Sequence, residues 1–135
     1  MNDLTVLIVS TDPVIGALLA LYVEVHQYRA AVLEEGEPPA TAVTRSDARI
    51  LIVDVEHRDG FTPAFIAGQR AAGRRVIAFS PKLLLQEVRQ RAEVLDIEAF
   101  AMPLDAVHFK AMLEDAAAAA PARGAVQRAP PEARP

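Results

Sequence analysis

The sequence predicts an α/β domain with a doubly wound, five-strand parallel sheet covered by helices on both faces. Five apolar, strand-like runs alternate with segments of helical spacing along the chain. The clearest run, Ile50 to Val55, is apolar on both faces until Asp54, as a central parallel strand requires. The chain has 135 residues, 52% of them hydrophobic, which suits a single core. The expected strand order is 2-1-3-4-5.

The first part of the chain predicts two strands and two helices. Leu4 to Val9 is an apolar run, and Asp12 and Pro13 after it are typical of a helix cap and a first helical turn. A short strand at Ala31–Leu33 and a short helix at Ala40–Arg45 follow. Apolar residues at helical spacing predict the first helix: Val14, Leu18, Leu21, Tyr22 and Val25.

The rest of the chain continues the alternation. Thr62-Pro63 and Ser80-Pro81 each read as a cap followed by a first turn, and each predicts the start of a helix. In the last helix we expect Val107, Met112 and Leu113 to point inward. The expected elements are a strand over 50–55, a helix over 62–72, a strand over 76–79, a helix over 80–95, a strand over 99–101 and a helix over 104–118.

The charge is unevenly distributed between a domain over 1–120 and a tail over 121–135. The tail holds three Arg and one Glu, so it carries +2 of the net −4 and leaves −6 for residues 1–120. Its Pro and Ala content predicts disorder. An acidic body argues against nucleic-acid binding and favours protein partners.

The sequence also lacks cysteine, a membrane-spanning stretch and a secretory signal, and each absence excludes a class of function. The chain has no cysteine, which excludes disulfides, thiolate nucleophiles and cysteine metal sites. The longest uncharged apolar stretch, Val14 to Val23, is too short to span a bilayer, and no basic segment precedes an apolar one at the N-terminus. We therefore expect a cytoplasmic protein without membrane association.

The candidate site lies where the strand order reverses, at the carboxyl ends of the first and third strands. Those ends read Ser10-Thr11-Asp12 and Asp54-Val55-Glu56, while the fourth and fifth strands end in Ala78-Phe79-Ser80 and Met102-Pro103. Over roughly residues 3–118 this ordered set resembles the receiver domain of two-component response regulators, which has a flavodoxin-like fold. The resemblance assigns Asp54 to the phosphoacceptor position, Ser80 to the switch hydroxyl and Met102 to the lysine.

The resemblance also shows what the chain lacks. A carboxylate attacks phosphorus only if the charge on the phosphoryl group is neutralised, by Mg²⁺ on an acidic pair and by a lysine. Here Ser10 and Thr11 replace the acidic pair, Met102 replaces the lysine, and Ala99 replaces the usual aromatic residue. A thioether donates no hydrogen bond to phosphate. These departures predict a pseudo-receiver that needs no cofactor.

Alternatives remain open at this stage. Asp12, Asp54 and Glu56 could surround Mg²⁺, which would make Asp54 a genuine phosphoacceptor with an atypical metal site. Arg58 could instead fold back to pair with Asp54. Asp54 could also only accept hydrogen bonds from loop amides, and Ser80 could be a helix cap. A small-ligand-binding, flavodoxin-like domain is the third possibility.

The expected function is therefore that of a stand-alone signalling module in a two-component system or phosphorelay, not an enzyme. It would act through contact with a histidine kinase or a downstream signalling protein. Receivers commonly use the face of the fourth helix, fifth strand and fifth helix for targets and for homodimers, so we expect the contact there. Long polar side chains on this face are Lys82, Gln86, Arg89, Gln90, Glu93, His108, Lys110 and Glu114.

Overall fold

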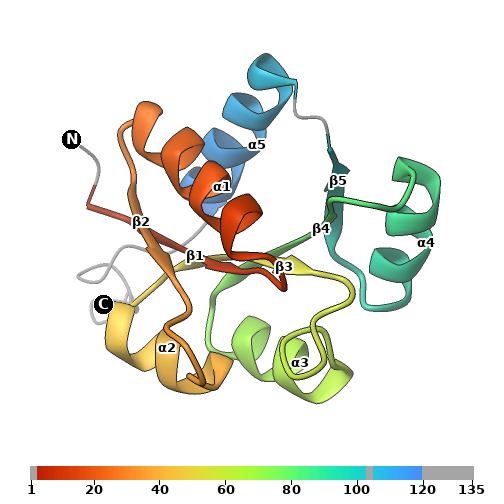
Figure 1. Ribbon diagram of the computed structural model, residues 1–135, viewed down its shortest axis with the longest axis horizontal. Coiled ribbons are helices and arrows are strands. Elements are labelled where there is room, and N and C mark those ends of the chain that lie inside the picture. Colours follow the sequence, from red (N-terminus) through yellow and green to blue (C-terminus); the bar gives the residue numbers. More distant parts are fainter. Residues whose placement is uncertain (1–2, 103–104, 120–135) are drawn as a thin grey trace, which may run out of the picture.

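A computed structural model describes residues 3–102 and 105–119, so the expected tail lies outside the described residues. Strands and helices alternate through the described chain, as the sequence predicts (Figure 1). The strands are β1 (Thr5–Val9), β2 (Arg29–Val32), β3 (Ile50–Asp54), β4 (Arg75–Ser80) and β5 (Glu98–Ala101). The helices are α1 (Pro13–Val25), α2 (Pro39–Ser46), α3 (Pro63–Ala71), α4 (Leu85–Val94) and α5 (Ala106–Ala119).

The five strands form one parallel sheet in the order β2-β1-β3-β4-β5, which confirms the predicted topology. All five residues of the central strand β3 are buried. Its apolar side chains face helices on both sides, which explains why this strand shows no polar alternation in the sequence.

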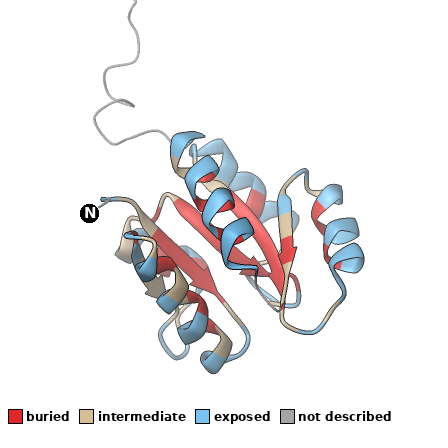
Figure 2. Ribbon diagram, turned by 90° about the horizontal axis from the view of Figure 1, so that it is seen from above, coloured by how far each residue is buried: buried red, intermediate tan, exposed pale blue. Residues whose placement is uncertain are grey.

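Alternate residues of the sheet supply two cores. Helices α1 and α5 cover one face and α2 and α3 the other, while α4 packs beside β5 at the sheet edge (Figure 1). The α1–α5 core includes Ile8, Ile52 and Phe79. The opposite core includes Leu7 and Val53, and it adjoins a smaller cluster beneath α4. Figure 2 shows the buried sheet between helices whose outer faces are exposed.

Two predicted helix caps are confirmed. Asp12 Oδ1 accepts hydrogen bonds from the amides of Val14, at 2.8 Å, and Ile15, at 3.4 Å. Thr62 Oγ1 accepts one from the Phe65 amide at 3.1 Å. These side chains satisfy amides that the first helical turn leaves without partners, so they fix where α1 and α3 begin.

The predicted start of the fourth helix at Ser80-Pro81 is wrong, because α4 begins at Leu85. Ser80 Oγ accepts hydrogen bonds from the amides of Lys82, at 3.1 Å, and Leu83, at 2.9 Å. The hydroxyl therefore holds a turn that precedes the helix. At the true start, Glu87 Oε1 accepts a hydrogen bond from the Leu84 amide at 3.1 Å.

The buried face of α1 differs from the residues that predicted the helix. Gly16, Leu19 and Val23 are buried against the sheet. Of the residues that carried the prediction, only Tyr22 is half-buried, where its ring meets the edge of Phe109. The others are exposed: Val14, Leu18, Leu21 and Val25.

In α5 the inward orientation expected of Met112 and Leu113 is confirmed, whereas Val107 is exposed. Among the described residues, no helix has the length and apolar character needed to cross a membrane.

Candidate functional site at the carboxyl edge of the sheet

The strand register brings the predicted site residues to one edge of the sheet. Val9 of β1 is level with Val53 of β3, and Asp54 is level with Phe79 of β4. Ser80 ends β4 beside Ala101 of β5. Because the strands are parallel, the loops that follow them emerge on the same side.

Asp54 is fully buried, with 0% of its surface exposed, and both carboxyl oxygens accept hydrogen bonds. Thr11 Oγ1 donates to Asp54 Oδ2 at 2.9 Å, and the Glu56 amide donates to Oδ1 at 2.9 Å. The structure thus joins Asp54, the residue that the resemblance assigns to the phosphoacceptor position, directly to Thr11. The resemblance places a carboxylate metal ligand where Thr11 stands, but Thr11 has a neutral hydroxyl that donates a hydrogen bond to Asp54.

The other acid-pair position, Ser10, belongs to the start of α1. Ser10 Oγ donates to the Asp12 carbonyl at 2.9 Å and accepts from the Asp12 amide at 3.1 Å. A Cβ built on Gly16 would lie 3.4 Å from Ser10 Cβ, so this helix packs closely on the serine. Ser10 therefore stabilises the β1–α1 turn.

The structure does not bring Asp12, Asp54 and Glu56 together as a metal site. Within the described residues, no three His, Cys, Asp or Glu side chains are grouped so that they could hold a metal ion. The Asp12 carboxylate caps α1, and Glu56 reaches Asp54 through its backbone amide while the residue itself is exposed.

The fold-back of Arg58 onto Asp54 is also not observed. Arg58 is exposed, and none of the ion pairs among the described residues joins it to Asp54. The expectation that loop amides hold Asp54 is met by the Glu56 amide, with the Thr11 hydroxyl as a second donor.

Met102, at the lysine position, is half-buried and packs against the α1–α5 core. Its backbone amide donates to the Ser80 carbonyl at 3.3 Å, which places it at the same edge as Asp54. The Met102 side chain supplies apolar contact and carries no charge.

His57 holds the loop after β3 in place, a role that the sequence did not predict. The His57 side chain is half-buried, and its Nδ1 accepts a hydrogen bond from the Gly60 amide at 2.9 Å. Its carbonyl accepts from the Phe61 amide at 3.0 Å. Gly60 is buried, and a Cβ there would lie 2.7 Å from Val9 Cγ1. The His-x-x-Gly spacing was the available signal.

A cavity of about 720 Å³ opens beside the site, between the start of α1 and the loops that follow β2 and β3. Thr11 lines it, but Asp54 and Met102 do not. A small-ligand site of the flavodoxin-like kind would be expected over all three residues, and this cavity, which is lined by apolar surface and by several carboxylates, is displaced from two of them. Its charged lining includes Asp12, Glu34, Glu35, Glu37 and Asp59.

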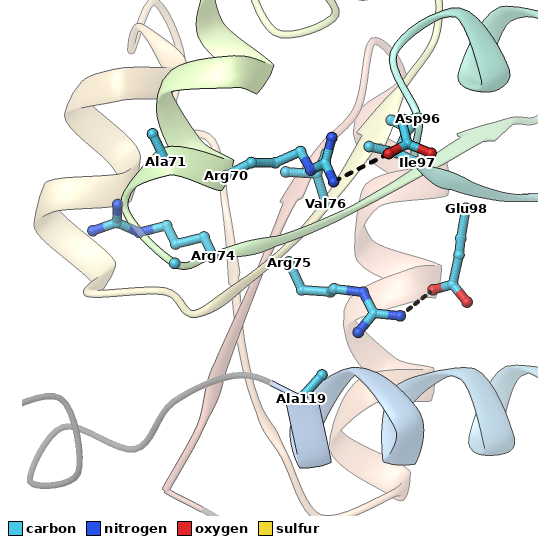
Figure 3. A pocket seen from close by; sticks show the side chains of 10 residues that line it. Arg70, Ala71, Arg74, Arg75, Val76, Asp96, Ile97, Glu98 and Ala119 are labelled. Carbon is cyan, nitrogen blue, oxygen red and sulfur yellow. Dashed lines mark hydrogen bonds and ion pairs between the residues drawn. The ribbon is translucent and has the colours of Figure 1, made fainter. Parts of the chain in front are cut away.

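A second cavity, of about 630 Å³, lies at the other end of the strands, where β4 and β5 begin (Figure 3). Arg70 pairs with Asp96 at 3.6 Å, and Arg75 pairs with Glu98 at 3.1 Å. Arg74 extends away from these pairs and donates to the Ala48 carbonyl at 3.0 Å. Burial, and then the charge of Arg49, lower the pKa of Arg74. The guanidinium groups diverge, so they do not form one anion site.

Comparisons with solved structures identify the fold. No protein-family model and no curated protein match the sequence. Chemotaxis protein CheY4 of Vibrio cholerae superposes with a TM-score of 0.66 at 12% identity, over 85% of this chain and 99% of that one. The BeF₃-activated receiver domain of Klebsiella pneumoniae RstA gives 0.67 at 14% identity, over 83% and 97%.

A putative pilus assembly-related protein from Burkholderia pseudomallei is similar too, with a TM-score of 0.67 at 23% identity over 89% of this chain and 93% of that one. The chain therefore has the fold of response-regulator receiver domains, and the resemblance drawn from the sequence is confirmed for the fold.

Proposed function

We propose that this chain, with its receiver-domain fold, is a signal-transduction module that works through protein contact and without phosphorylation of Asp54. One observation carries the proposal: Asp54 is buried and bound by the Thr11 hydroxyl at 2.9 Å. The carboxyl that would attack phosphorus is thus used as a structural hydrogen-bond acceptor.

The charge around Asp54 supports the same conclusion. Phosphoryl transfer proceeds through positioning and neutralisation of charge, supplied by metal ions and cationic side chains. Thr11 offers a neutral hydroxyl and Met102 a thioether at the two positions where that charge is needed. Two neutral oxygens such as those of Ser10 and Thr11 are weak Mg²⁺ ligands compared with carboxylates.

The state of Ser80 supports it as well. The hydroxyl is buried, and the amides of Lys82 and Leu83 already donate to it. Moving Ser80 toward a phosphoryl group would leave two amides of the β4–α4 turn without an acceptor. Ala99 is half-buried beneath α4, so the position where receivers carry the aromatic side chain that reports phosphorylation holds only a methyl group.

We place the partner contact on the face formed by α4, β5 and α5. Gln86, Arg89, Gln90 and Glu93 are exposed on α4, while His108, Lys110 and Glu114 are exposed on α5. Val88 and Ala92 are buried and hold α4 on the sheet. Since nothing in this face depends on a phosphorylated Asp54, binding of a histidine kinase or a downstream signalling protein would be constitutive.

The test is to reverse charge at Arg89 and Lys110 and to measure affinity for the partner recovered from native lysate. We expect the double variant Arg89→Glu, Lys110→Glu to bind at least tenfold more weakly, while Asp54→Asn binds as the wild type does. Unchanged affinity in the double variant, with binding abolished by Asp54→Asn, would contradict the proposal by moving the contact to the strand-end site.

A further inference from the structure

Helix α1 carries an apolar stripe on the side that faces away from the sheet. The stripe consists of Val14, Leu18, Leu21 and Val25, whose exposed fractions are 74%, 37%, 58% and 62%. The residues that hold α1 on the sheet lie on the opposite side, at Gly16, Leu19 and Val23. The stripe therefore contributes nothing to the core of the domain.

Charge is nearly absent from this helix. Glu24 is the one charged residue within α1, whereas α4 carries Glu87, Arg89, Arg91 and Glu93. The outer face of a surface helix is normally polar, and a contiguous exposed apolar patch marks an interaction site.

The spacing of the stripe residues indicates what kind of surface covers them. Successive residues of the stripe are separated by four, three and four positions, which is the spacing of the apolar residues that meet between two paired helices. The order Val-Leu-Leu-Val, with this spacing, reads the same in both directions. A two-fold axis between Leu18 and Leu21 therefore maps the stripe onto an antiparallel copy, so that Val14 meets Val25 of the second copy.

We propose that two copies of this chain associate through antiparallel pairing of their α1 helices. The antiparallel arrangement also suits the charges, because it places each Glu24 beside Ala17 of the second copy.

The exposed apolar area of the stripe limits the affinity of the two helices for each other. Covering both stripes completely removes roughly 800 Å² from water, which is in the range of weak, transient contacts and below that of stable interfaces. We therefore expect a weak, reversible dimer that forms only at high protein concentration. Because α1 packs on β1 and β2, the dimer leaves α4 and β5 at the other edge of the sheet open, whereas α5 of the proposed partner face lies next to α1.

The first experiment follows mass against concentration by sedimentation equilibrium. We expect the wild type to dimerise, and Leu21→Lys to weaken the dimer at least tenfold. Val94→Lys, at a position on α4 that is 83% exposed, is the matched control and should leave the dimer unchanged. A wild type that stays monomeric up to about millimolar concentration, or a dimer that Val94→Lys dissociates, would overturn the proposal.

The second experiment fixes the orientation and does not depend on the strength of the dimer. The chain has no cysteine, so single cysteines report clean cross-links. A mixture of Val14→Cys and Val25→Cys should form a disulfide between copies under mild oxidation. Val14→Cys alone should not, because in the antiparallel pair its equivalent is roughly 16 Å further along the helix. Cross-linking of Val14→Cys with itself, and not with Val25→Cys, would overturn the antiparallel pair.

Discussion

The hydroxyl of Thr11 donates a hydrogen bond to Asp54 Oδ2 across 2.9 Å, from the loop after β1 to the end of β3. By the resemblance drawn from the sequence, these two residues would correspond to a metal ligand and the phosphoacceptor of receiver domains. The contact links the loop after β1 to the end of β3 through a neutral hydroxyl that donates a hydrogen bond. The functional proposal depends on this contact.

Removing the Thr11 hydroxyl should destabilise the domain. In Thr11→Val one oxygen of the buried Asp54 carboxyl loses its donor, so we expect the free energy of unfolding to fall by about 1–2 kcal/mol. Thr11→Ser keeps a hydroxyl and should lose less than half of that. Urea denaturation followed by circular dichroism measures both. Equal stability of Thr11→Val and wild type would show that the hydrogen bond does not hold Asp54.

Gly60 should not tolerate a side chain. The Cβ of Gly60→Ala would lie 2.7 Å from Val9 Cγ1 and 3.2 Å from His57 Nδ1, so the loop after β3 must shift. We expect a loss of about 1–3 kcal/mol of stability. Gly68→Ala in α3 is the control, because nothing lies within 4 Å of its Cβ, and it should gain about 0.5–1 kcal/mol. Similar melting temperatures for the two variants would contradict this packing.

The pair of Glu37 and Arg45 should make stability depend on acid pH. Hydrogen bonds from Arg45, and then from the Glu34 amide, lower the pKa of Glu37 from 4.5 to about 2. A lowered folded-state pKa means that the pair stabilises the domain fully above about pH 4.5, and that this contribution is lost as the pH falls through about 2.

The measurement compares urea midpoints of wild type and Glu37→Gln across this range. The difference between them should be largest near neutral pH and should shrink between about pH 4.5 and pH 2. Glu34→Gln is the control, because Glu34 lies 4.0 Å from Arg45 and is 70% exposed. A difference that stays constant with pH would show that ionised Glu37 contributes nothing.

Restoring charge to the site should restore chemistry. In the triple variant Ser10→Asp, Thr11→Asp, Met102→Lys, a carboxylate stands beside Asp54 in place of the Thr11 hydroxyl. We expect the apo domain to lose stability by like-charge repulsion and Mg²⁺ to raise its melting temperature. Acetyl phosphate should then label Asp54. A folded triple variant whose melting temperature does not change with Mg²⁺ would show that these positions do not correspond to those of receivers.

The sequence predicted those elements whose own residue pattern also suits their position in the fold. The run Ile50 to Val53 is apolar because β3 is covered on both faces, and Asp12 caps α1 because its carboxylate accepts two amides. Pairing of Thr11 with Asp54 needed the register of β1 and β3, which the pattern of residues does not specify.

The errors have physical causes. Helix α1 is apolar on both sides, so helical spacing predicted the helix but could not show which side faces the sheet. Ser80-Pro81 has the composition of a helix start, but a serine that accepts amides two and three residues later also forms a free-standing turn. The contacts of His57 depend on how the loop after β3 packs on Val9 and Val53.

The most direct test of the central claim is intact-mass spectrometry of the wild type after incubation with acetyl phosphate and Mg²⁺. A competent receiver of known activity serves as the positive control, and Asp54→Asn as the negative control. We predict that the wild type gains no phosphoryl group and has the same mass as before incubation. A phosphorylated species that forms in the wild type and is absent from Asp54→Asn would contradict it.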